Sequence, residues 1–319
     1  MKLTSINNGV ALQIDEFDIT CASKNDINKV LEHLKKNLIV VIKKQDKSPA
    51  FFTNFVSNLG PISNYTQFRW DPKTGKEIYN PDPNSKMIDP LLWDDPTTYP
   101  VQRVTGKKID GKKSGIFGSG ILDWHANLNG LDRADGVALQ GYQDCENTST
   151  TWLNLAKAYE EMPTDLKNRC ENVFCEYEYS PEIWASGLPE TQKQAMLSNR
   201  GDGRITRGNT GIYRMWLVQE NIAGTKGIYF YTNNKCKIIS KDQKLYEDLK
   251  NFIFQKKYMY THEYELGDIV LSDQLLSLHK RDQNDPEILE KRILHRLTFR
   301  ISNFGNPSWI SLQNKINID

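Results

Sequence analysis

The sequence predicts a mixed α/β fold that consists mainly of strands. Two observations support this class. The first 60 residues alternate short apolar runs with amphipathic helical segments, and the rest of the chain carries many short apolar or alternating runs separated by turns. All-β barrels of about this length commonly form one domain, so residues 1–319 are expected to form a single unit.

The opening segment predicts a strand, a helix, a second strand and a second helix. A strand is expected over residues 11–14, and a helix follows Ser23, which is a suitable N-cap. The β-branched run 38–42 predicts a buried strand. A helix is then expected from Pro49, and Gly60 ends it.

Residues 65–120 lose this periodicity and carry clusters of Pro, Asp, Gly and Lys. A loop of this length is unusual inside a domain unless it is functional or disordered. Because it runs directly into the strand that carries His125, we interpret it as an insertion that covers a substrate site. A plain surface excursion is the alternative, and residues 306–319 are interpreted as a C-terminal tail.

The remaining elements follow from periodicity and turn residues. Strands are expected over 122–128, 137–142, 212–217 and 227–231, and a Gly-Asp turn leads into a further strand that ends at Asp273. Helices are expected over 155–174, with a break at Pro163, and over 244–254. Irregular structure is expected over 177–211, and Thr150 could hydrogen-bond a ligand from inside a barrel.

The last strand places Arg292, Leu294 and Arg296 on one face and His295 on an apolar opposite face. If the apolar face packs against outer helices, both arginines point inward, where unpaired guanidinium groups would be too costly without an anion. A ligand carboxylate is the natural partner, and a surface strand with solvated arginines is the alternative. His295 is interpreted as a packed histidine and not as a ligand.

Strand alternation also places His125 and Asn127 on one face. If His279 arrives from another strand, two imidazoles and one oxygen donor meet, with open positions for substrate or oxygen. Such a site normally uses a carboxylate, whereas Asn127 supplies a neutral amide oxygen. Asp123, on the same strand face, is the alternative oxygen donor.

Composition excludes several classes of partner. The chain has 41 Lys and Arg against 40 Asp and Glu, so no overall charge favours nucleic acid or an anionic membrane. It has neither an apolar signal core nor a run of about 20 apolar residues, which predicts a cytoplasmic protein. The five cysteines are odd in number and form no Cys-x-x-Cys pair, so reduced thiols are expected.

Several short motifs occur together in a fixed order. They are Trp124-His125-Ala126-Asn127, Thr150 before Trp152, Gly267-Asp268-Ile269-Val270 with Asp273 six residues before His279, and Arg292-Ile293-Leu294-His295-Arg296. In this order and over nearly the whole length, the chain resembles the taurine dioxygenase-like (TauD/TfdA-type) Fe(II)/2-oxoglutarate-dependent oxygenases.

The resemblance implies a double-stranded β-helix, or jelly-roll, core with flanking helices and long lid insertions. It implies that His125 and His279 bind Fe(II), with Asn127 at the position where the family has Asp. It further implies that Arg292, aided by Thr150, holds the distal carboxylate of 2-oxoglutarate, and that Arg296 lies near the cosubstrate or the substrate.

The implied reaction uses O2 to hydroxylate an unactivated C–H bond of a small polar metabolite, with release of succinate and CO2. Taurine is not expected as the substrate, because Ile121 is apolar where taurine-specific members have a polar residue. Asn127 leaves open a halogenase or a non-catalytic protein that binds 2-oxoglutarate or metal, and an unrelated β-sandwich binding module is a further alternative. Oligomeric state is left open, a homo-oligomer included.

Overall fold

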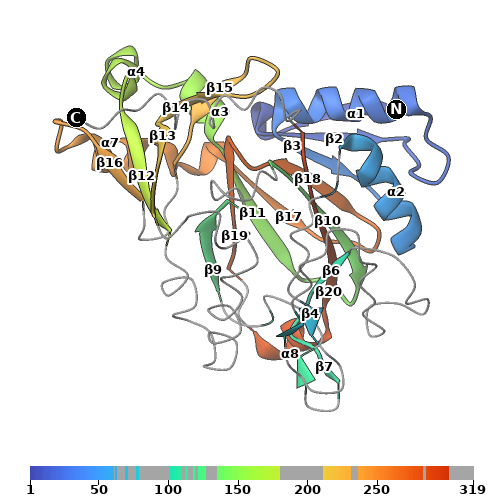
Figure 1. The fold of residues 1–319 in the computed structure, drawn as a ribbon. Coiled ribbons are helices and arrows are strands. Elements are labelled where there is room, and N and C mark those ends of the chain that lie inside the picture. The colour runs from blue at the N-terminus through green and yellow to red at the C-terminus, as the bar shows by residue number, and fades with distance from the viewer. Residues whose placement is uncertain are drawn as a thin grey trace.

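The computed structural model describes residues 1–60, 62, 69–70, 77–78, 101–109, 112–113, 118, 121–126, 135–179, 211–230, 236–282 and 285–301. Its centre is formed by a seven-stranded and a four-stranded sheet, with helices on both outer faces (Figure 1). None of the helices in these ranges is long and apolar enough to cross a membrane.

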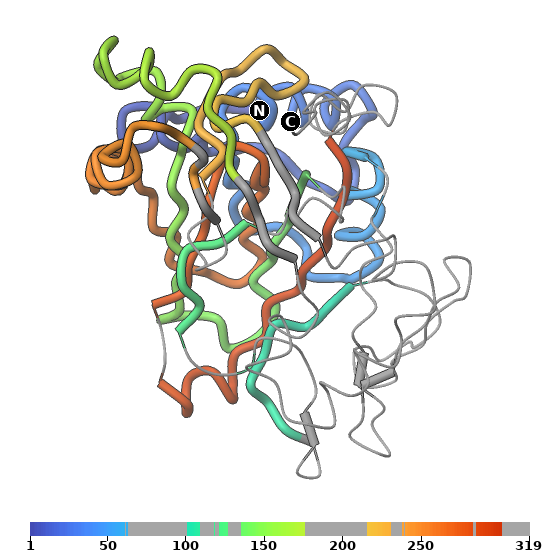
Figure 2. The backbone as a smooth tube through the Cα atoms, turned by 60° about the vertical axis from the view of Figure 1, so that its left-hand side comes forward, coloured from blue at the N-terminus to red at the C-terminus, as the bar shows by residue number. Residues whose placement is uncertain are grey.

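The seven-stranded sheet has the order β1-β2-β3-β18-β10-β20-β6. Its strands are β1 (Lys2–Ile6), β2 (Ala11–Asp15), β3 (Ile39–Ile42), β18 (Ile269–Asp273), β10 (Gly136–Gln143), β20 (Ile293–Phe299) and β6 (Gln102–Val104). All pairs are antiparallel except β2 with β3, which are joined by a crossover helix. Figure 2 shows β6 lying beside β20 at the edge of this sheet.

The four-stranded sheet has the order β17-β11-β19-β9 and is antiparallel throughout. Its strands are β17 (Met259–Glu263), β11 (Ser149–Asn154), β19 (Ser277–Arg281) and β9 (Leu122–His125). Chain segments far apart in sequence therefore meet in this sheet, and it brings His125 next to His279.

Three apolar clusters hold these layers together. One lies between the two sheets and includes Val137, Val270 and Leu294 from the larger sheet with Trp152 and Tyr260 from the smaller one. The other two lie on the outer faces, under the helices. Burial of these clusters is the main source of stability for the layered arrangement.

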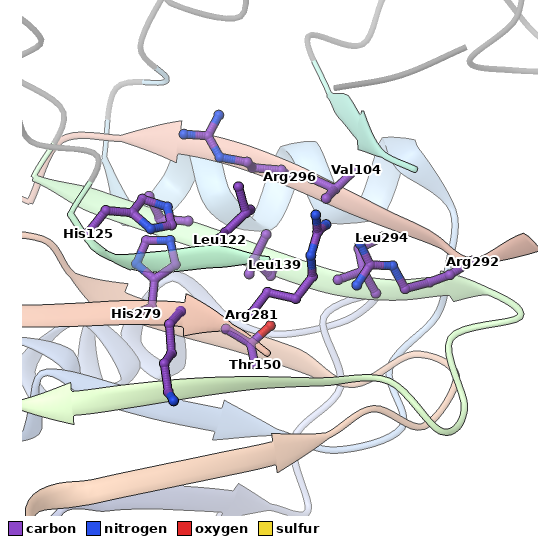
Figure 3. Close-up of a pocket in the computed structure, with 12 residues that line it drawn as sticks. Val104, Leu122, His125, Leu139, Thr150, His279, Arg281, Arg292, Leu294 and Arg296 are labelled. Carbon is purple, nitrogen blue, oxygen red and sulfur yellow. The ribbon is translucent and has the colours of Figure 1, made fainter. Parts of the chain in front are cut away.

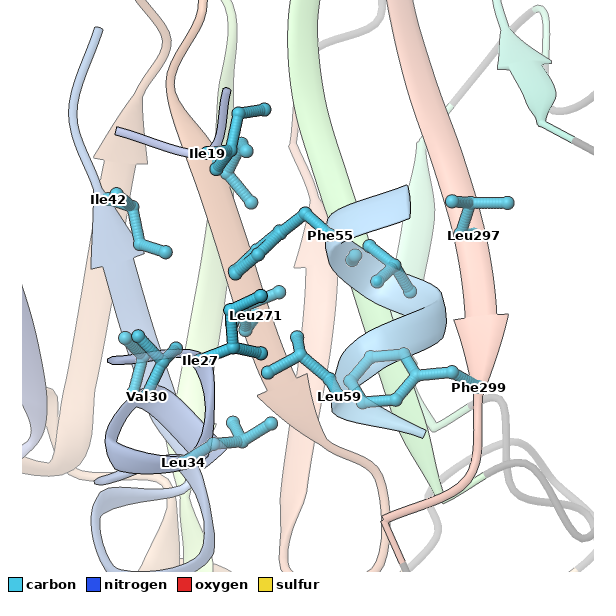
Figure 4. Close-up of a cluster of buried hydrophobic side chains, with 14 of the residues drawn as sticks. Ile19, Ile27, Val30, Leu34, Ile42, Phe55, Leu59, Leu271, Leu297 and Phe299 are labelled. Carbon is cyan, nitrogen blue, oxygen red and sulfur yellow. The ribbon is translucent and has the colours of Figure 1, made fainter. Parts of the chain in front are cut away.

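Helices α1 (Lys24–Asn37) and α2 (Pro49–Leu59) cover the outer face of the larger sheet. Figure 4 shows Phe55 and Leu59 of α2 packing towards Leu297 and Phe299 of β20. Because these apolar side chains of β20 face the helices, strand alternation turns the other face of β20 towards the smaller sheet.

The outer face of the smaller sheet is covered by α3 (Leu155–Glu160), α4 (Thr164–Cys170) and α7 (Leu245–Ile253). A third sheet lies beside them, with the order β13-β12-β16. The remaining elements are β12 (Phe174–Tyr179), β13 (Gly211–Trp216), β16 (Cys236–Ile239), β14 (Val218–Glu220), β15 (Lys226–Ile228), β4 (Arg69–Trp70), β5 (Glu77–Ile78), β7 (Lys108–Ile109), β8 (Lys112–Lys113), α8 (Pro286–Lys291), η1 (Asn7–Gly9) and η3 (Lys256–Tyr258).

Most predicted elements are confirmed, and the mixed, mainly β class is correct. Ser23 caps α1 by accepting a hydrogen bond from the backbone of Asp26, and Pro163 separates α3 from α4 as expected. Gly267, in the predicted Gly-Asp turn, has φ of +83°, a conformation that glycine adopts without strain. Among the described cysteines, no disulfide involves Cys21, Cys145, Cys170 or Cys175.

Three predictions were wrong. Residues 102–104 were expected in a loop but form β6, because their strand pairing with β20 outweighs the weak local pattern. Residues 177–179 were expected to be irregular but belong to β12. The helix expected over 155–174 ends at Cys170, and Phe174 begins β12. Most of the 65–120 insertion and the tail 306–319 lie outside the described residues.

Candidate functional site

A cavity of about 450 Å³, its open mouth included, lies between the two main sheets. The smaller sheet contributes His125, Thr150, His279 and Arg281, and β6, β10 and β20 of the larger sheet line the opposite side. Figure 3 shows the two imidazoles at one end and Arg292 at the other. Predicted site residues more than 150 positions apart in sequence therefore share one cavity.

His125 and His279 are direct cross-strand partners on β9 and β19, as the sequence required. Their ring centroids are 4.2 Å apart, and the planes are inclined by 50°. His279 is buried and His125 is half-buried. Two imidazoles this close can both contact one metal ion.

Both imidazoles are held in the protonation state that a metal ligand requires. Burial lowers the pKa of His125, partly offset by its hydrogen bond to the Asp123 carbonyl. Burial, with the neighbouring His125 and Arg296, lowers the pKa of His279 well below its usual value. His125 Nδ1 lies 2.7 Å from the Asp123 carbonyl oxygen. That oxygen can only accept, so Nδ1 carries the proton and the Nε2 lone pair is available to a metal.

The described residues offer no third side chain that could bind a metal ion together with the two histidines. Asn127, predicted to lie on the same strand face as His125, falls outside them. Asp123 is exposed, and its Oδ1 accepts a hydrogen bond of 2.8 Å from the backbone of Trp124. Within the described ranges no group of three His, Cys, Asp or Glu side chains could hold a metal ion, so Asp123 does not complete a site with the two histidines.

Arg292 carries a buried charge with no partner in the described part of the chain. Its side chain is only 1% exposed, and none of its three guanidinium nitrogens has a hydrogen-bond partner there. Burial lowers the pKa of this guanidinium, but arginine remains charged at neutral pH. A buried cation of this kind is costly unless an anion binds to it, so Arg292 fits a ligand carboxylate.

Thr150 and Tyr264 form a hydrogen-bonded pair beside this guanidinium. Thr150 lines the cavity, and the Tyr264 hydroxyl donates to Thr150 Oγ1 at 3.4 Å. Tyr264 is 2% exposed and packs in the cluster between the sheets. The predicted cosubstrate residues Thr150 and Arg292 are therefore brought together, and Tyr264 supports them from inside the core.

The cavity holds two further arginines. Arg296, which was predicted here, is buried and donates a hydrogen bond to Gln102 on β6. Arg281 was missed, although it follows His279 by two residues and strand alternation could have placed it on the same face. Burial, together with Arg292, lowers the pKa of Arg281 to about 10. Arg281 and Arg292 make the described lining basic away from the histidines, whereas the guanidinium of Arg296 lies nearer to His125 (Figure 3).

His295 is not part of the cavity, in agreement with its prediction as a packed residue. It is fully buried on the opposite face of β20, and its ring stacks on Tyr142 with centroids 3.9 Å apart. Burial lowers the pKa of His295 to about 3.

Comparisons with known proteins agree with this arrangement. The family model described as "Taurine catabolism dioxygenase TauD, TfdA family" matches residues 4–298. A pentalenolactone F synthase from Streptomyces avermitilis is 21% identical over 303 residues, which cover 88% of this chain and 87% of that protein. A pentalenolactone F synthase from Streptomyces arenae is 20% identical over 206 residues, which cover 62% of this chain and 67% of that protein.

Two solved structures show the same fold. AAD-2 in complex with Mn(II) and N-oxalylglycine has a TM-score of 0.60 at 16% identity, covering 95% of this chain and 98% of that one. A taurine dioxygenase from Burkholderia xenovorans has a TM-score of 0.60 at 14% identity, covering 93% and 88%. The family match spans nearly the whole chain, so the expected cofactors are Fe(II) and 2-oxoglutarate, and the expected reactants are O2 and a small molecule. The chain belongs to the TauD/TfdA family and is an Fe(II)- and 2-oxoglutarate-dependent dioxygenase.

Proposed function

We propose that this protein hydroxylates an unactivated C–H bond of a small polar metabolite, with release of succinate and CO2. The observation that carries the proposal is the buried Arg292 guanidinium, which has no partner among the described residues. Its position at the opposite end of the cavity from the histidine pair suits a molecule with a metal-chelating group at one end and a carboxylate at the other (Figure 3). 2-Oxoglutarate has this form.

Each predicted site residue has a definite task in this proposal. His125 and His279 would hold Fe(II) through neutral imidazole nitrogens, and Asn127 would occupy the third ligand position. Arg292 would bind the distal carboxylate of 2-oxoglutarate through its planar fork of donors. The Thr150 hydroxyl accepts a hydrogen bond from Tyr264. The proton of the Thr150 hydroxyl would therefore be available to the same carboxylate. Arg296 would lie beside the cosubstrate or the substrate.

The cavity walls would keep bulk water from the reacting groups. Val137, Leu139 and Leu294 line it with apolar surface, and a low-polarity wall strengthens the ion pair at Arg292. When bound, iron and 2-oxoglutarate supply the oxidising chemistry that no side chain can perform. We also infer that the two packed sheets are the faces of a jelly roll, and that part of the 65–120 segment covers the cavity.

Anaerobic titration with Fe(II) and 2-oxoglutarate tests this proposal. We expect a metal-to-ligand charge-transfer band in the wild type, loss of the band in His279→Ala, and a much higher 2-oxoglutarate concentration for half-saturation in Arg292→Ala. Lys108→Ala, at an exposed position in β7, is the control for loss of a positive charge elsewhere. Equal small effects of Arg292→Ala and Lys108→Ala would place the carboxylate site elsewhere.

A halogenase is the second candidate, and the observation that favours it is the neutral Asn127 at a position where the family has a carboxylate. A halide ion would then occupy a vacant metal position. Product analysis with a metabolite library in the presence of chloride and bromide distinguishes the two reactions. Hydroxylated products with no halide incorporation would exclude the halogenase.

A further inference from the structure

Four aromatic side chains form a continuous row across the smaller sheet. Tyr260 on β17, Trp152 on β11, His279 on β19 and His125 on β9 are successive cross-strand partners. Ring centroids are 6.4 Å apart for Tyr260 and Trp152, and 6.5 Å apart for Trp152 and His279, with nearly parallel planes in both pairs. The row begins at the proposed metal ligands and runs into the core, and the proposed hydroxylation assigns no task to Trp152 or Tyr260.

The inner end of the row meets a proton acceptor. The Tyr260 hydroxyl lies 2.8 Å from His262 Nδ1, and His262 Nε2 lies 3.2 Å from the Asp268 carboxylate. That carboxylate favours the imidazole proton on Nε2, so Nδ1 is left to accept from the phenol. Asp268 is fully buried and also contacts Lys43 Nζ at 2.5 Å. An imidazolium formed at His262 would therefore face a fixed negative charge.

Trp152, unlike Tyr260, has no hydrogen-bonded proton acceptor among the described residues. It is 1% exposed, and its indole nitrogen has no hydrogen-bond partner among the described residues. A buried indole N–H without an acceptor is uncommon and calls for an explanation. No described base is hydrogen-bonded to the indole to take its proton, so an oxidised Trp152 would pass the oxidation on to Tyr260, where a hydrogen-bonded proton acceptor is in place.

We propose that Trp152 and Tyr260 form a one-electron relay that discharges the oxidant of the metal site when no substrate consumes it. This proposal rests on the proposed function, which supplies the oxidant from O2 and 2-oxoglutarate. One electron leaves Tyr260 and reaches the metal site through the Trp152 ring. The hydroxyl proton of Tyr260 moves to His262 Nδ1, which leaves a neutral phenoxyl radical, an imidazolium beside Asp268 and a metal site reduced by one electron.

The relay is completed by an external reductant. A thiol or ascorbate-type molecule gives one electron to the phenoxyl radical and is itself oxidised by one electron, and His262 returns the proton, so the original Tyr260 is restored. A second passage of the same kind delivers the second electron that the unused oxidant requires, and solvent supplies the protons taken up at the metal site. The damage that an unused oxidant would cause beside His125 and His279 is thereby moved to a residue that can be repaired. Stacking alone would stabilise the sheet, but it requires neither the hydrogen bond to His262 nor the buried carboxylate behind it.

The test follows radicals rather than product. Protein loaded anaerobically with Fe(II) and 2-oxoglutarate is mixed with O2 without substrate, frozen at short times and measured by electron paramagnetic resonance. We expect a tyrosyl radical whose splitting changes when the protein is grown with ring-deuterated tyrosine. The signal should be lost in Tyr260→Phe and weakened in His262→Gln. It should persist in Tyr246→Phe, whose ring packs in the outer cluster under the helices.

A second readout is the chemical survival of the protein. During turnover without substrate, Tyr260→Phe should inactivate after fewer cycles than the wild type, and peptide mass spectrometry should find oxidation nearer the histidine pair. Trp152→Phe should delay formation of the tyrosyl radical. If Trp152→Phe does not fold, Tyr260→Phe still tests the relay, because it keeps the aromatic ring that packs in the core and removes only the hydroxyl group. Two outcomes overturn the relay but leave the proposed function standing. In both, succinate forms, and either the tyrosyl signal is unchanged in Tyr260→Phe or the wild type gives no tyrosyl signal. Absence of the charge-transfer band in the wild type overturns the proposed function and the relay with it.

Discussion

Tyr264 donates a hydrogen bond to Thr150 Oγ1 across 3.4 Å, on the protein side of the cavity wall. The hydroxyl of Thr150 therefore has one lone pair occupied, and its proton is free to point into the cavity. Tyr264 is buried in the cluster between the sheets and is itself not among the cavity-lining residues. Its contribution to ligand binding must pass through Thr150.

Tyr264→Phe should weaken 2-oxoglutarate binding by roughly 0.5–1.5 kcal/mol, the usual net value of one hydrogen bond, or about two- to tenfold in Kd. The same change made in a Thr150→Val background should have almost no effect, because the acceptor is already gone. Anaerobic titration of the four proteins gives the coupling energy directly. Additive effects of the two substitutions would mean that Tyr264 acts independently of Thr150.

Arg292→Leu should raise the stability of the ligand-free protein and weaken its binding of 2-oxoglutarate. Removal of a buried guanidinium that lacks a partner in the described residues removes a desolvation cost. We therefore expect the ligand-free variant to melt a few degrees higher than the wild type, since about 1 kcal/mol shifts Tm by roughly 2–4 °C in larger domains. The wild type should gain stability on addition of 2-oxoglutarate with Mn(II), and the variant should not. A lower ligand-free Tm in Arg292→Leu would show that other groups stabilise the charge of Arg292 when no ligand is bound.

Asn127→Asp should tighten binding of Fe(II). A carboxylate oxygen offsets the charge of a divalent cation, whereas the amide oxygen of asparagine carries no charge. Metal affinity can be measured by competition with a chelator, and halide addition gives a second test. If a halide occupies the position in the wild type, chloride should shift the charge-transfer band of the wild type but not that of the variant. Equal Fe(II) affinities would show that residue 127 is not a metal ligand.

Asp273 predicts a pH dependence of stability. Its pKa is raised to about 7, mainly by burial and also by the neighbouring Asp135, while backbone hydrogen bonds from Leu276 and Leu275 oppose the rise. The folded pKa lies above the ordinary value of 3.8, so the folded protein holds this proton more tightly than the unfolded chain. The resulting stabilisation is fully present below the unfolded pKa and is lost as the pH rises through about 7.

Asp273→Asn keeps an oxygen that can accept from Leu275 and Leu276 but does not titrate. The variant should gain stability relative to the wild type at about pH 8 and lose most of that advantage at about pH 5. Thermal melts at both pH values provide the measurement, and Asp144→Asn at an exposed position is the control. A stability difference that is independent of pH would show that Asp273 is ionised in both states.

The sequence predicted elements whose signals are local. Caps and breakers such as Ser23 and Pro163 act within one turn of helix, and period-two alternation in β20 was sufficient to place Arg292 and Arg296 on the inward face. β6 could not be predicted in this way. It has three residues, and its strand conformation depends on pairing with β20, which follows nearly two hundred positions later.

The site was predicted in part, for a similar reason. The motifs identified His125, His279, Thr150 and Arg292, and the structure places all four around one cavity. Tyr264 carries no motif, because its contribution depends on a hydrogen bond between residues 114 positions apart. The register that aligns Tyr260, Trp152 and His279 is likewise set by strand pairing and has no signature in the linear sequence.

The position of β9 should make hydrogen exchange in this strand depend on whether a metal ion is bound. In the described part of the chain β9 is the terminal strand of its sheet and pairs only with β19. A metal ion shared by His125 and His279 would fasten this outermost strand to its neighbour, whereas the empty protein relies on a few backbone hydrogen bonds that open easily. The amide protons of Trp124 and His125 should therefore exchange with solvent at rates that depend on metal occupancy, while those of β11 at the centre of the same sheet should not.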